Sequence, residues 1–341
     1  MKIDKVVFST TEEFSPWWNI QSYIWKEKFN IEPVCILWGD INNTNMKDTY
    51  GEIIEKKYNP ELLKSLQMTW SKFYHPHTEP EKTWLIGDID MVPLTRHFYV
   101  DNIEHIDEDA YVHIGYDVLT GKEQSWLEYE GLPAPGHVAK GKIFSKALGL
   151  DECSFEDQID RIQNDPLCRF GQETQPEHIE KYIWFAERNG YKSFDPVESD
   201  MSEISFWQAD ERYSTWRLRR CLGEYHSSEL PGPYWIKQTT GYVCGNMSVP
   251  LANQNDDKSI DFIGVPGFDL REDTQYGGLI TRVDRSRFSD FKYNFWKNEK
   301  AEQGKFIDLH GARPYSLQES SLYDVLSYFW GEDVRTVRTT Q

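Results

Sequence analysis

The chain has 341 residues, of which 15% are aromatic, and its formal net charge is −19. A chain of this length buries a sizeable core, either as one large α/β domain or as two smaller ones. The negative charge repels phosphate backbones and anionic lipid, which excludes binding of nucleic acid or of a membrane surface through a general basic face. An anionic substrate would therefore need a metal ion or a local cationic pocket.

The five cysteines favour a reducing compartment. They are far apart, odd in number and include no C-x-x-C pair, which argues against a disulfide framework and a zinc ribbon. The first residues, MKIDKVVFSTTEEF, are too short and too charged for a signal peptide, and no apolar run of about 18 residues occurs. We expect a cytoplasmic protein without an integral membrane segment.

The first 95 residues predict alternating strands and helices. Runs of β-branched and other apolar residues predict strands, and apolar residues at helical spacing predict helices, with Ser15 and Asn59 as caps. The elements in chain order are a strand at 5–10, a helix at 15–30, a strand at 32–40, a helix at 59–74 and a strand at 83–90. This order is typical of a parallel sheet covered by helices, whose binding sites lie beyond the carboxyl ends of the strands.

The pattern after residue 95 is less regular. We predict a strand at 110–119, a strand that leads into a helix at 137–150, and a hairpin or strand pair at 234–249. Helices are expected at 176–190 and 203–223, and a late strand within 291–315. The segments 120–136 and 250–275 are expected to be long functional or disordered loops. No repeat, low-complexity stretch or linker divides the chain, so we expect a single domain over 1–341.

The segment TWLIGDIDMVPL, at 83–94, ends a predicted buried strand in two carboxylates. Asp88 and Asp90 stand one residue apart at the turn, where both can reach one hard divalent ion. An ion held there can bridge the two phosphates of a nucleotide and neutralise a leaving diphosphate. An ordinary acidic turn after a strand is the alternative reading.

This segment resembles the D-x-D motif of glycosyltransferases with the GT-A fold, in which a β-α-β-α-β nucleotide-binding half ends in apolar residues and D-x-D. The resemblance implies a GT-A-like α/β fold, with a mixed, mostly parallel central sheet flanked by helices and a Rossmann-like N-terminal half. It implies a nucleotide-sugar-binding half at 1–95 and an acceptor-binding half at 96–341. Carried over, Asp90 is the main ligand of Mn²⁺ or Mg²⁺, and Asp88 is the second ligand and touches ribose or sugar.

The late segment FIDLHGARPYS, at 306–316, extends the resemblance. Many retaining GT-A enzymes supply a third metal ligand from a late histidine in a pattern like H-x-x-G-x-x-K-P-W. Here His310 would be that ligand and Arg313 would contact the diphosphate. The glycine follows the histidine at once and the spacing to the cation is shorter, so a core histidine and a surface arginine remain the alternative.

Ser9, Thr10 and Thr11 stand at the carboxyl end of the first predicted strand. In the family, the loop at this position contacts the base and ribose through backbone and hydroxyl groups. A helix-capping or turn cluster explains the same three residues equally well.

Asp210 and Glu211 are the candidates for catalytic carboxylates. An inverting enzyme needs a carboxylate to take the acceptor hydroxyl proton, and in GT-A enzymes an acidic residue of this region often faces the acceptor. Two acids in the first turn of a helix are also favoured by the helix dipole. Further candidates are Asp269, Glu272 and Asp273 as bases, and His137, Lys140 and Asn246 as sugar contacts.

Together these features predict a metal-dependent glycosyltransferase, of hexosyl or pentosyl type. Its partners would be a nucleotide-diphosphate sugar donor and a carbohydrate or glycoconjugate acceptor; the base, the sugar and the stereochemistry are not readable. One alternative is a haloacid-dehalogenase-like phosphohydrolase, whose D-x-D-x-[TV] motif D-I-D-M-V fits, although that motif normally ends the first strand. The other is a non-catalytic, sugar-binding GT-A-like domain.

Overall fold

The structure is a computed structural model. It describes residues 1–114, 132–164, 209–222, 235–238, 241–244, 260, 262–265, 281–283, 306–310 and 315–337. Within these ranges no helix combines the length and the apolar character that crossing a bilayer requires.

A nine-stranded sheet organises the chain, in the order β3-β2-β1-β4-β7-β6-β10-β9-β8. Strands β3, β2, β1 and β4 are parallel, as are β6 and β10, whereas β7 and β9 run antiparallel to both of their neighbours. This is the mixed, mostly parallel sheet expected of a GT-A-like α/β fold. The strands are β1 (Lys5–Thr11), β2 (Glu32–Trp38), β3 (Glu52–Lys56), β4 (Thr83–Ile86), β6 (Tyr111–Ile114), β7 (His137–Lys140), β8 (Trp235–Gln238), β9 (Gly241–Cys244) and β10 (Phe262–Val265).

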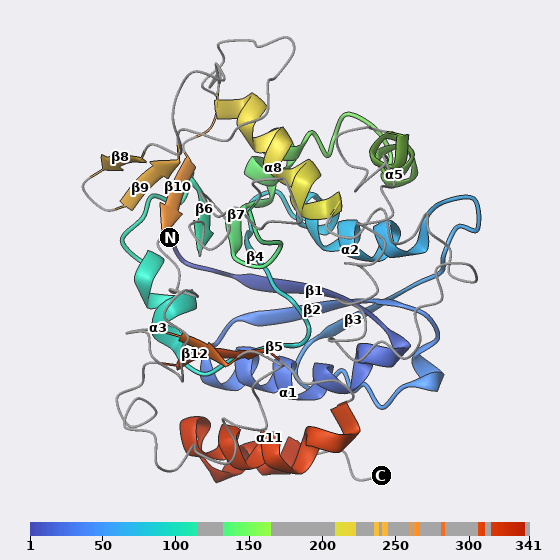
Figure 1. Cartoon of the computed structure of the whole chain (residues 1–341), viewed down its shortest axis with the longest axis vertical. Helices are drawn as coiled ribbons and strands as arrows, with labels where there is room; N and C mark the ends of the chain where they lie inside the picture. The colour runs from blue at the N-terminus through green and yellow to red at the C-terminus, as the bar shows by residue number, and fades with distance from the viewer. Residues whose placement is uncertain are drawn as a thin grey trace, which may run out of the picture.

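Helices cover both faces of the sheet, because strands such as β1 are apolar on both sides. Val7 points into one buried cluster and Phe8 into the other. The Val7 cluster includes residues of α2 (Lys64–Tyr74), α4 (Gly141–Leu148), α5 (Phe155–Asn164) and α8 (Ala209–Leu222); the Phe8 cluster includes residues of α1 (Trp18–Tyr23), α3 (Arg96–Tyr99) and α11 (Tyr315–Trp330). Figure 1 shows β1 to β3 between α2 on one side and α1 on the other, with α11 beyond α1.

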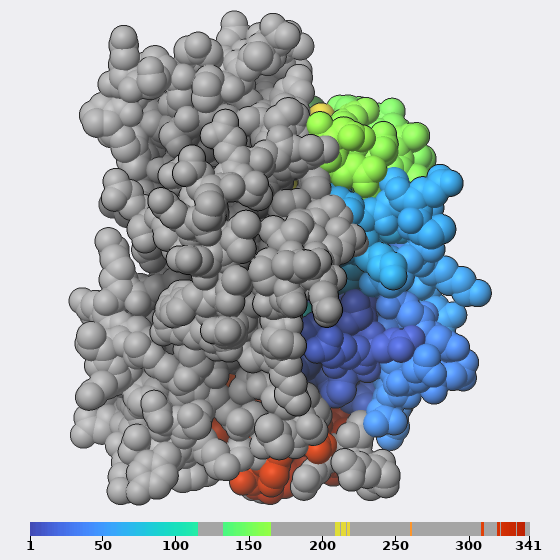
Figure 2. Space-filling view, turned by 45° about the vertical axis from the view of Figure 1, so that its right-hand side comes forward, coloured from blue at the N-terminus to red at the C-terminus, as the bar shows by residue number. Residues whose placement is uncertain are grey.

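The N-terminal part of the chain lies along one side of the face that Figure 2 shows. Figure 2 shows its blue residues between green residues from the region of α4 and α5 above and red residues of α11 below. The first and last parts of the chain therefore meet on this face.

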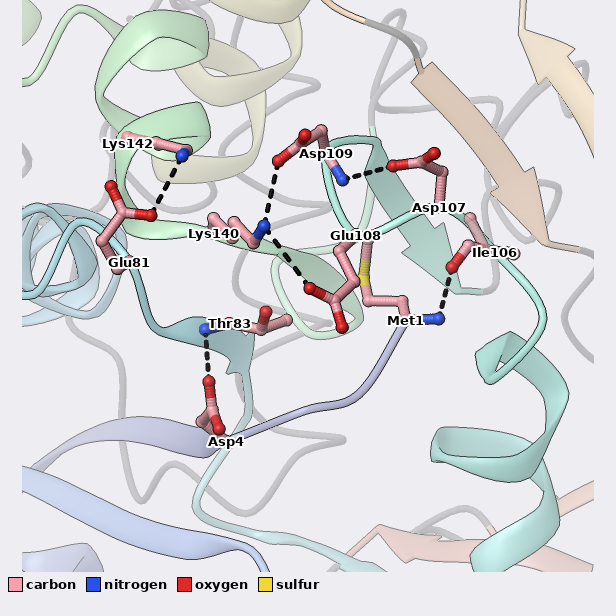
Figure 3. A network of polar contacts seen from close by, with 10 residues as sticks. All are labelled: Met1, Asp4, Glu81, Thr83, Ile106, Asp107, Glu108, Asp109, Lys140 and Lys142. Carbon is pink, nitrogen blue, oxygen red and sulfur yellow. Dashed lines mark hydrogen bonds and ion pairs between the residues drawn. The ribbon is translucent and has the colours of Figure 1, made fainter.

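Polar contacts gather at the end of the sheet where β1 and β4 begin (Figure 3). They join Asp4 with the Thr83 backbone, Lys142 with Glu81, Lys140 with Glu108 and Asp109, and the Met1 amino group with the Ile106 carbonyl. The acidic partners of the two lysines are 60–74% exposed, so these ion pairs are strongly screened and contribute little. The opposite, carboxyl end of β4 carries the D-x-D residues.

A second, three-stranded sheet joins the late chain to the residues that follow D-x-D. Its order is β11-β12-β5, with β5 at Met91–Pro93, β12 at Phe306–His310 and β11 at Thr281–Val283. Strand β12 is antiparallel to β5, so that Asp308 lies opposite Pro93 and His310 opposite Met91. Trp330 Nε1 also donates to the Pro93 carbonyl at 2.9 Å.

The helix predicted at 15–30 is helical throughout most of its length but is not one α-helix. A 3₁₀ helix (η1, Glu12–Trp17) precedes α1, and a π-helical turn (η2, Ile24–Lys28) follows it. Ser15 is not the cap, because it lies inside η1 and its Oγ donates to the Glu12 carbonyl at 2.7 Å.

The helix predicted at 59–74 begins at Lys64. Asn59 caps a turn before the helix, since its Oδ1 accepts from the Glu61 backbone at 3.0 Å. The α-helix therefore begins about one turn later than the sequence predicts.

Four of the described strands were not predicted: β3, β5, β10 and β11. Strands β5 and β11 have three residues each, too few to show a period. Strand β3 is a half-exposed edge strand of sequence EIIEK, whose charges hide the pattern. Strand β10 lies within 250–275, which we had predicted to be a loop, and pairs with β6. The predicted helix 176–190 lies outside the described residues.

Candidate active site

The D-x-D residues lie in a tight loop between β4 and β5, residues 87–90, which we call the acidic loop. The Gly87 backbone N–H donates to the Val7 carbonyl at 2.9 Å, and the Met91 N–H closes a turn onto the Asp88 carbonyl at 3.1 Å. A Cβ at Gly87 would lie 2.4 Å from Cε1 of the buried Phe8 ring, so glycine is required by space here. The Asp88 side chain is 31% exposed, and Asp90 is buried.

Lys72 projects from α2 onto this loop. Its Nζ lies 2.5 Å from Asp88 Oδ1, and the side chain is only 7% exposed. Burial lowers the pKa of Lys72, but the carboxylates of Asp88, Asp210 and Glu211 outweigh burial and leave the pKa above its ordinary value. Lys72 is therefore a buried cation at neutral pH.

Asp210 and Glu211 lie in the first turn of α8, and the charges of both raise the pKa of the same lysine. Asp210 is buried, and burial raises its pKa; Lys72 opposes this rise and Asp88 adds to it. Glu211 Oε1 accepts from the Ala134 backbone at 2.9 Å. Asp210 and Glu211 lie more than one hundred positions from D-x-D in the sequence, yet they interact with the same lysine, Lys72, that pairs with Asp88.

Sequence reasoning missed Lys72. The spacing did not mark it, because at 100° per residue Lys72 lies roughly 120° around the helix from the apolar stripe of Leu66, Trp70 and Phe73. Its burial, and hence its need for a partner of opposite charge, becomes visible only in the fold.

Two buried histidines lie behind this cluster, on β6 and β7. His137 Nδ1 is 2.8 Å from the Tyr111 hydroxyl, and His113 Nε2 is 2.9 Å from the Pro133 carbonyl. Burial lowers the pKa of His113 to about 4. Burial also lowers the pKa of His137 far below its ordinary value, and His113 and Lys72 lower it further. Both rings are neutral at physiological pH.

The two sugar-contact candidates of this region have other surroundings. His137 is fully buried against Tyr111, which does not fit a sugar contact. Lys140 pairs with Glu108 and Asp109 near the start of β4, away from the acidic loop. Asn246, Asp269, Glu272 and Asp273 lie outside the described residues.

Strand β12 brings the backbone of His310 beside the acidic loop, since it lies opposite Met91, the residue after Asp90. The side chain of His310 and the whole of Arg313 lie outside the described part of the chain. Among the side chains that are described, no three from histidine, cysteine, aspartate and glutamate form a metal-ligating group.

The residues at the end of β1 line up with the end of β2. Thr11 is paired with Trp38. Ser9 Oγ lies 3.6 Å from Met68 Sδ, and Thr10 Oγ1 donates to the Thr11 carbonyl at 3.2 Å. Ser9 and Thr10 are buried and Thr11 is half-buried, so Thr11 has the most accessible side chain of the three.

No family model matches the chain, and no curated protein matches it. Among solved structures, an active-site mutant of LgtC matches with 12% identity and a TM-score of 0.32, over 58% of this chain and 83% of that one. The galactosyltransferase LgtC with donor and acceptor sugar analogues matches with 14% identity and a TM-score of 0.27, over 46% and 65%. The bifunctional glycosyltransferase WbbM matches with 10% identity and a TM-score of 0.32, over 99% and 52%. The chain is therefore similar to these proteins only distantly.

Proposed function

We propose that this chain is a metal-dependent glycosyltransferase that moves a sugar from a nucleotide-diphosphate sugar to an acceptor hydroxyl. One observation carries the proposal: β12 pairs with β5, so the backbone of His310 lies opposite Met91, directly beside Asp90. Asp90 and His310 are more than two hundred positions apart in the sequence. The pairing of β12 with β5 supports the proposal, because two ligands of one metal ion must lie close together.

The donor set fits a hard divalent ion. Asp88 and Asp90 offer carboxylate oxygens, which suit both Mg²⁺ and Mn²⁺, and the imidazole nitrogen that His310 would add favours Mn²⁺ of the two. When bound, the ion would neutralise the charge that develops on the leaving diphosphate. Arg313 would add a second positive charge, and Ser9, Thr10 and Thr11 would bind the nucleoside from the end of β1.

Lys72 has two tasks in this proposal. It holds one carboxylate oxygen of Asp88 at 2.5 Å and leaves the other for a ligand, because a carboxylate has two acceptor oxygens. Its buried charge also lowers the electrostatic cost of bringing a diphosphate to a loop that already carries two aspartates.

Asp210 is the preferred general base, the group that takes the proton from the hydroxyl of the acceptor substrate. Its raised pKa brings it closer to neutral pH, where a general base works best. Glu211 is the second choice, since one of its oxygens already accepts from the Ala134 backbone. The acceptor would bind on the side of α8.

Calorimetric binding of UDP and of GDP, each with and without Mn²⁺, tests the proposal. Wild type and Asp90→Asn are compared, with Asp109→Asn as a control at an acid that is 69% exposed and paired with Lys140. Binding of one nucleotide that needs both Mn²⁺ and Asp90 supports the proposal. Absence of binding of either nucleotide, together with release of phosphate from a generic phosphomonoester, would instead favour the phosphohydrolase alternative.

A further inference from the structure

The backbone of the acidic loop is held from below by one buried amide, that of Gln21 on α1. Its Nε2 lies 3.4 Å from the Asp88 carbonyl, 3.0 Å from the Ile89 carbonyl and 2.6 Å from the Met91 carbonyl. Gln21 is fully buried. Figure 1 shows α1 running beneath β5.

The orientation of this amide is fixed by its other end. Trp25 Nε1 lies 3.2 Å from Gln21 Oε1. An indole N–H can only donate, so the oxygen of Gln21 faces Trp25 and the NH₂ group faces the loop. Trp25 reaches this position from η2, the π-helical turn after α1, and such turns are frequent beside functional sites.

The amide has two protons for three carbonyls. The two shorter contacts, to Ile89 and Met91, take one proton each, and the Asp88 carbonyl is satisfied mainly by the Met91 N–H of the turn. Without Gln21, buried carbonyls would lose their donor, which is costly enough to change the loop conformation.

We propose that Gln21 is a positioning residue of the metal site: it fixes the backbone of the acidic loop, and thereby the direction in which Asp88 and Asp90 point. This inference rests on the proposed function. The three atoms that Gln21 Nε2 contacts are the main-chain carbonyls of Asp88, Ile89 and Met91, so it acts through the backbone that carries the two aspartates and not on substrate.

Asn19 offers a matched control on the same helix. It is also a buried amide with two partners on another segment, since its Nδ2 lies 2.8 Å from the Asn45 carbonyl and its Oδ1 accepts from Lys47 N–H at 2.9 Å. Asn19→Leu and Gln21→Leu therefore both remove a buried amide from α1, but only Gln21→Leu frees the acidic loop.

For each variant, electron paramagnetic resonance measures the Kd of Mn²⁺ in the presence of UDP or GDP, whichever wild type binds. Urea unfolding measures the midpoint of each variant. Both leucine variants should have a lower urea midpoint. Gln21→Leu should weaken Mn²⁺ binding about 10-fold or more, the usual effect of removing support behind a metal ligand, whereas Asn19→Leu should leave the Kd within about twofold of wild type, since it supports no ligand.

Equal Mn²⁺ affinity in Gln21→Leu and Asn19→Leu, with loss of affinity in Asp90→Asn, would overturn the role of Gln21 and leave the proposed function standing. Absence of Mn²⁺ binding in wild type would overturn both. Should Gln21→Leu fail to fold, Trp25→Phe replaces it, because this change keeps an aromatic ring at the position but removes the indole N–H that orients the amide. An unchanged Kd in Trp25→Phe would then refute the inference, and a raised Kd would support it.

Discussion

Lys72 Nζ lies 2.5 Å from Asp88 Oδ1, and this contact joins helix α2 to the acidic loop sixteen positions later. The lysine is buried, and its pKa stays above the ordinary value only because three carboxylates outweigh its burial. One cation therefore stabilises acids from two distant parts of the chain, Asp88 at the end of β4 and Asp210 at the start of α8. Several consequences of this arrangement can be measured.

Lys72→Met should destabilise the protein by about 3 kcal/mol, because it leaves the buried carboxylate of Asp210 without its compensating charge. The same change should abolish metal-dependent nucleotide binding or weaken it strongly, since Asp88 loses the group that orients it. Urea unfolding and calorimetry measure the two effects.

Lys26→Met is the control for this prediction. Lys26 pairs with Glu32, but the two side chains are 40% and 42% exposed, so the loss should be at most about 1 kcal/mol. Equal losses of stability in Lys72→Met and Lys26→Met would show that Lys72 and the three acids around it do not form a tightly coupled buried group.

Asp210→Asn should remove the acid limb of the pH–rate profile. Burial raises the pKa of Asp210 above its ordinary 3.8, so as a base it becomes active only as the pH rises through this raised value. We expect the variant to lose about 100-fold or more in kcat. A profile whose acid limb persists in Asp210→Asn would exclude this residue as the base and leave Glu211 as the candidate.

The same pKa shift predicts a stability effect of defined sign. Between pH 3.8 and the raised pKa, the folded state binds the Asp210 proton and the unfolded state does not. Rising pH across this window therefore lowers the stability of wild type relative to Asp210→Asn. Urea midpoints of both proteins over this range measure the difference, and a difference that is independent of pH would contradict the prediction.

The sequence predicted the part of the fold in which local pattern and burial agree. Strands β1, β2 and β4 are apolar on both faces, so their runs of apolar residues were readable, and their parallel pairing followed from the helices between them. Strand β3 was not readable, because its edge position lets it carry glutamate and lysine. Helix α1 was predicted too long, since the change to a π-helical turn depends on packing and leaves no mark in the spacing.

The candidate site was predictable where its residues are adjacent in sequence. The spacing of Asp88 and Asp90 singles them out in the sequence. Lys72 and Gln21, in contrast, reach the acidic loop from helices on opposite faces of the sheet. A lone lysine and a lone glutamine within helices carry no spacing that singles them out. Their importance follows from the carboxylate and the carbonyls that they meet, which sequence alone does not bring together.

The buried histidines should make the protein sensitive to acid. Burial lowers the pKa of His113 to about 4. As the pH falls below 6.5, His113 therefore becomes protonated in the unfolded state but stays neutral in the folded state. Stability is therefore lost between pH 6.5 and about 4, and His113 alone should remove about 2 kcal/mol by pH 5. The measurement compares urea unfolding of wild type and His113→Gln at pH 7.5 and pH 5. Equal losses on acidification in both proteins would exclude His113 as the cause.

Gly87→Ala should destabilise the protein and disturb the acidic loop. The added Cβ would meet Phe8 Cε1 at 2.4 Å, and the Phe8 ring cannot retreat freely, because it is buried between Trp18 and Trp25 with ring centroids at 6.4 and 6.5 Å. Overpacking of this kind costs about 1–3 kcal/mol. Phe8→Leu creates space at the same point, so the double variant should lose less stability than the two single changes added together. Additive losses in a urea-unfolding cycle would show that the contact with Phe8 does not require glycine at position 87, and that another feature of the loop does.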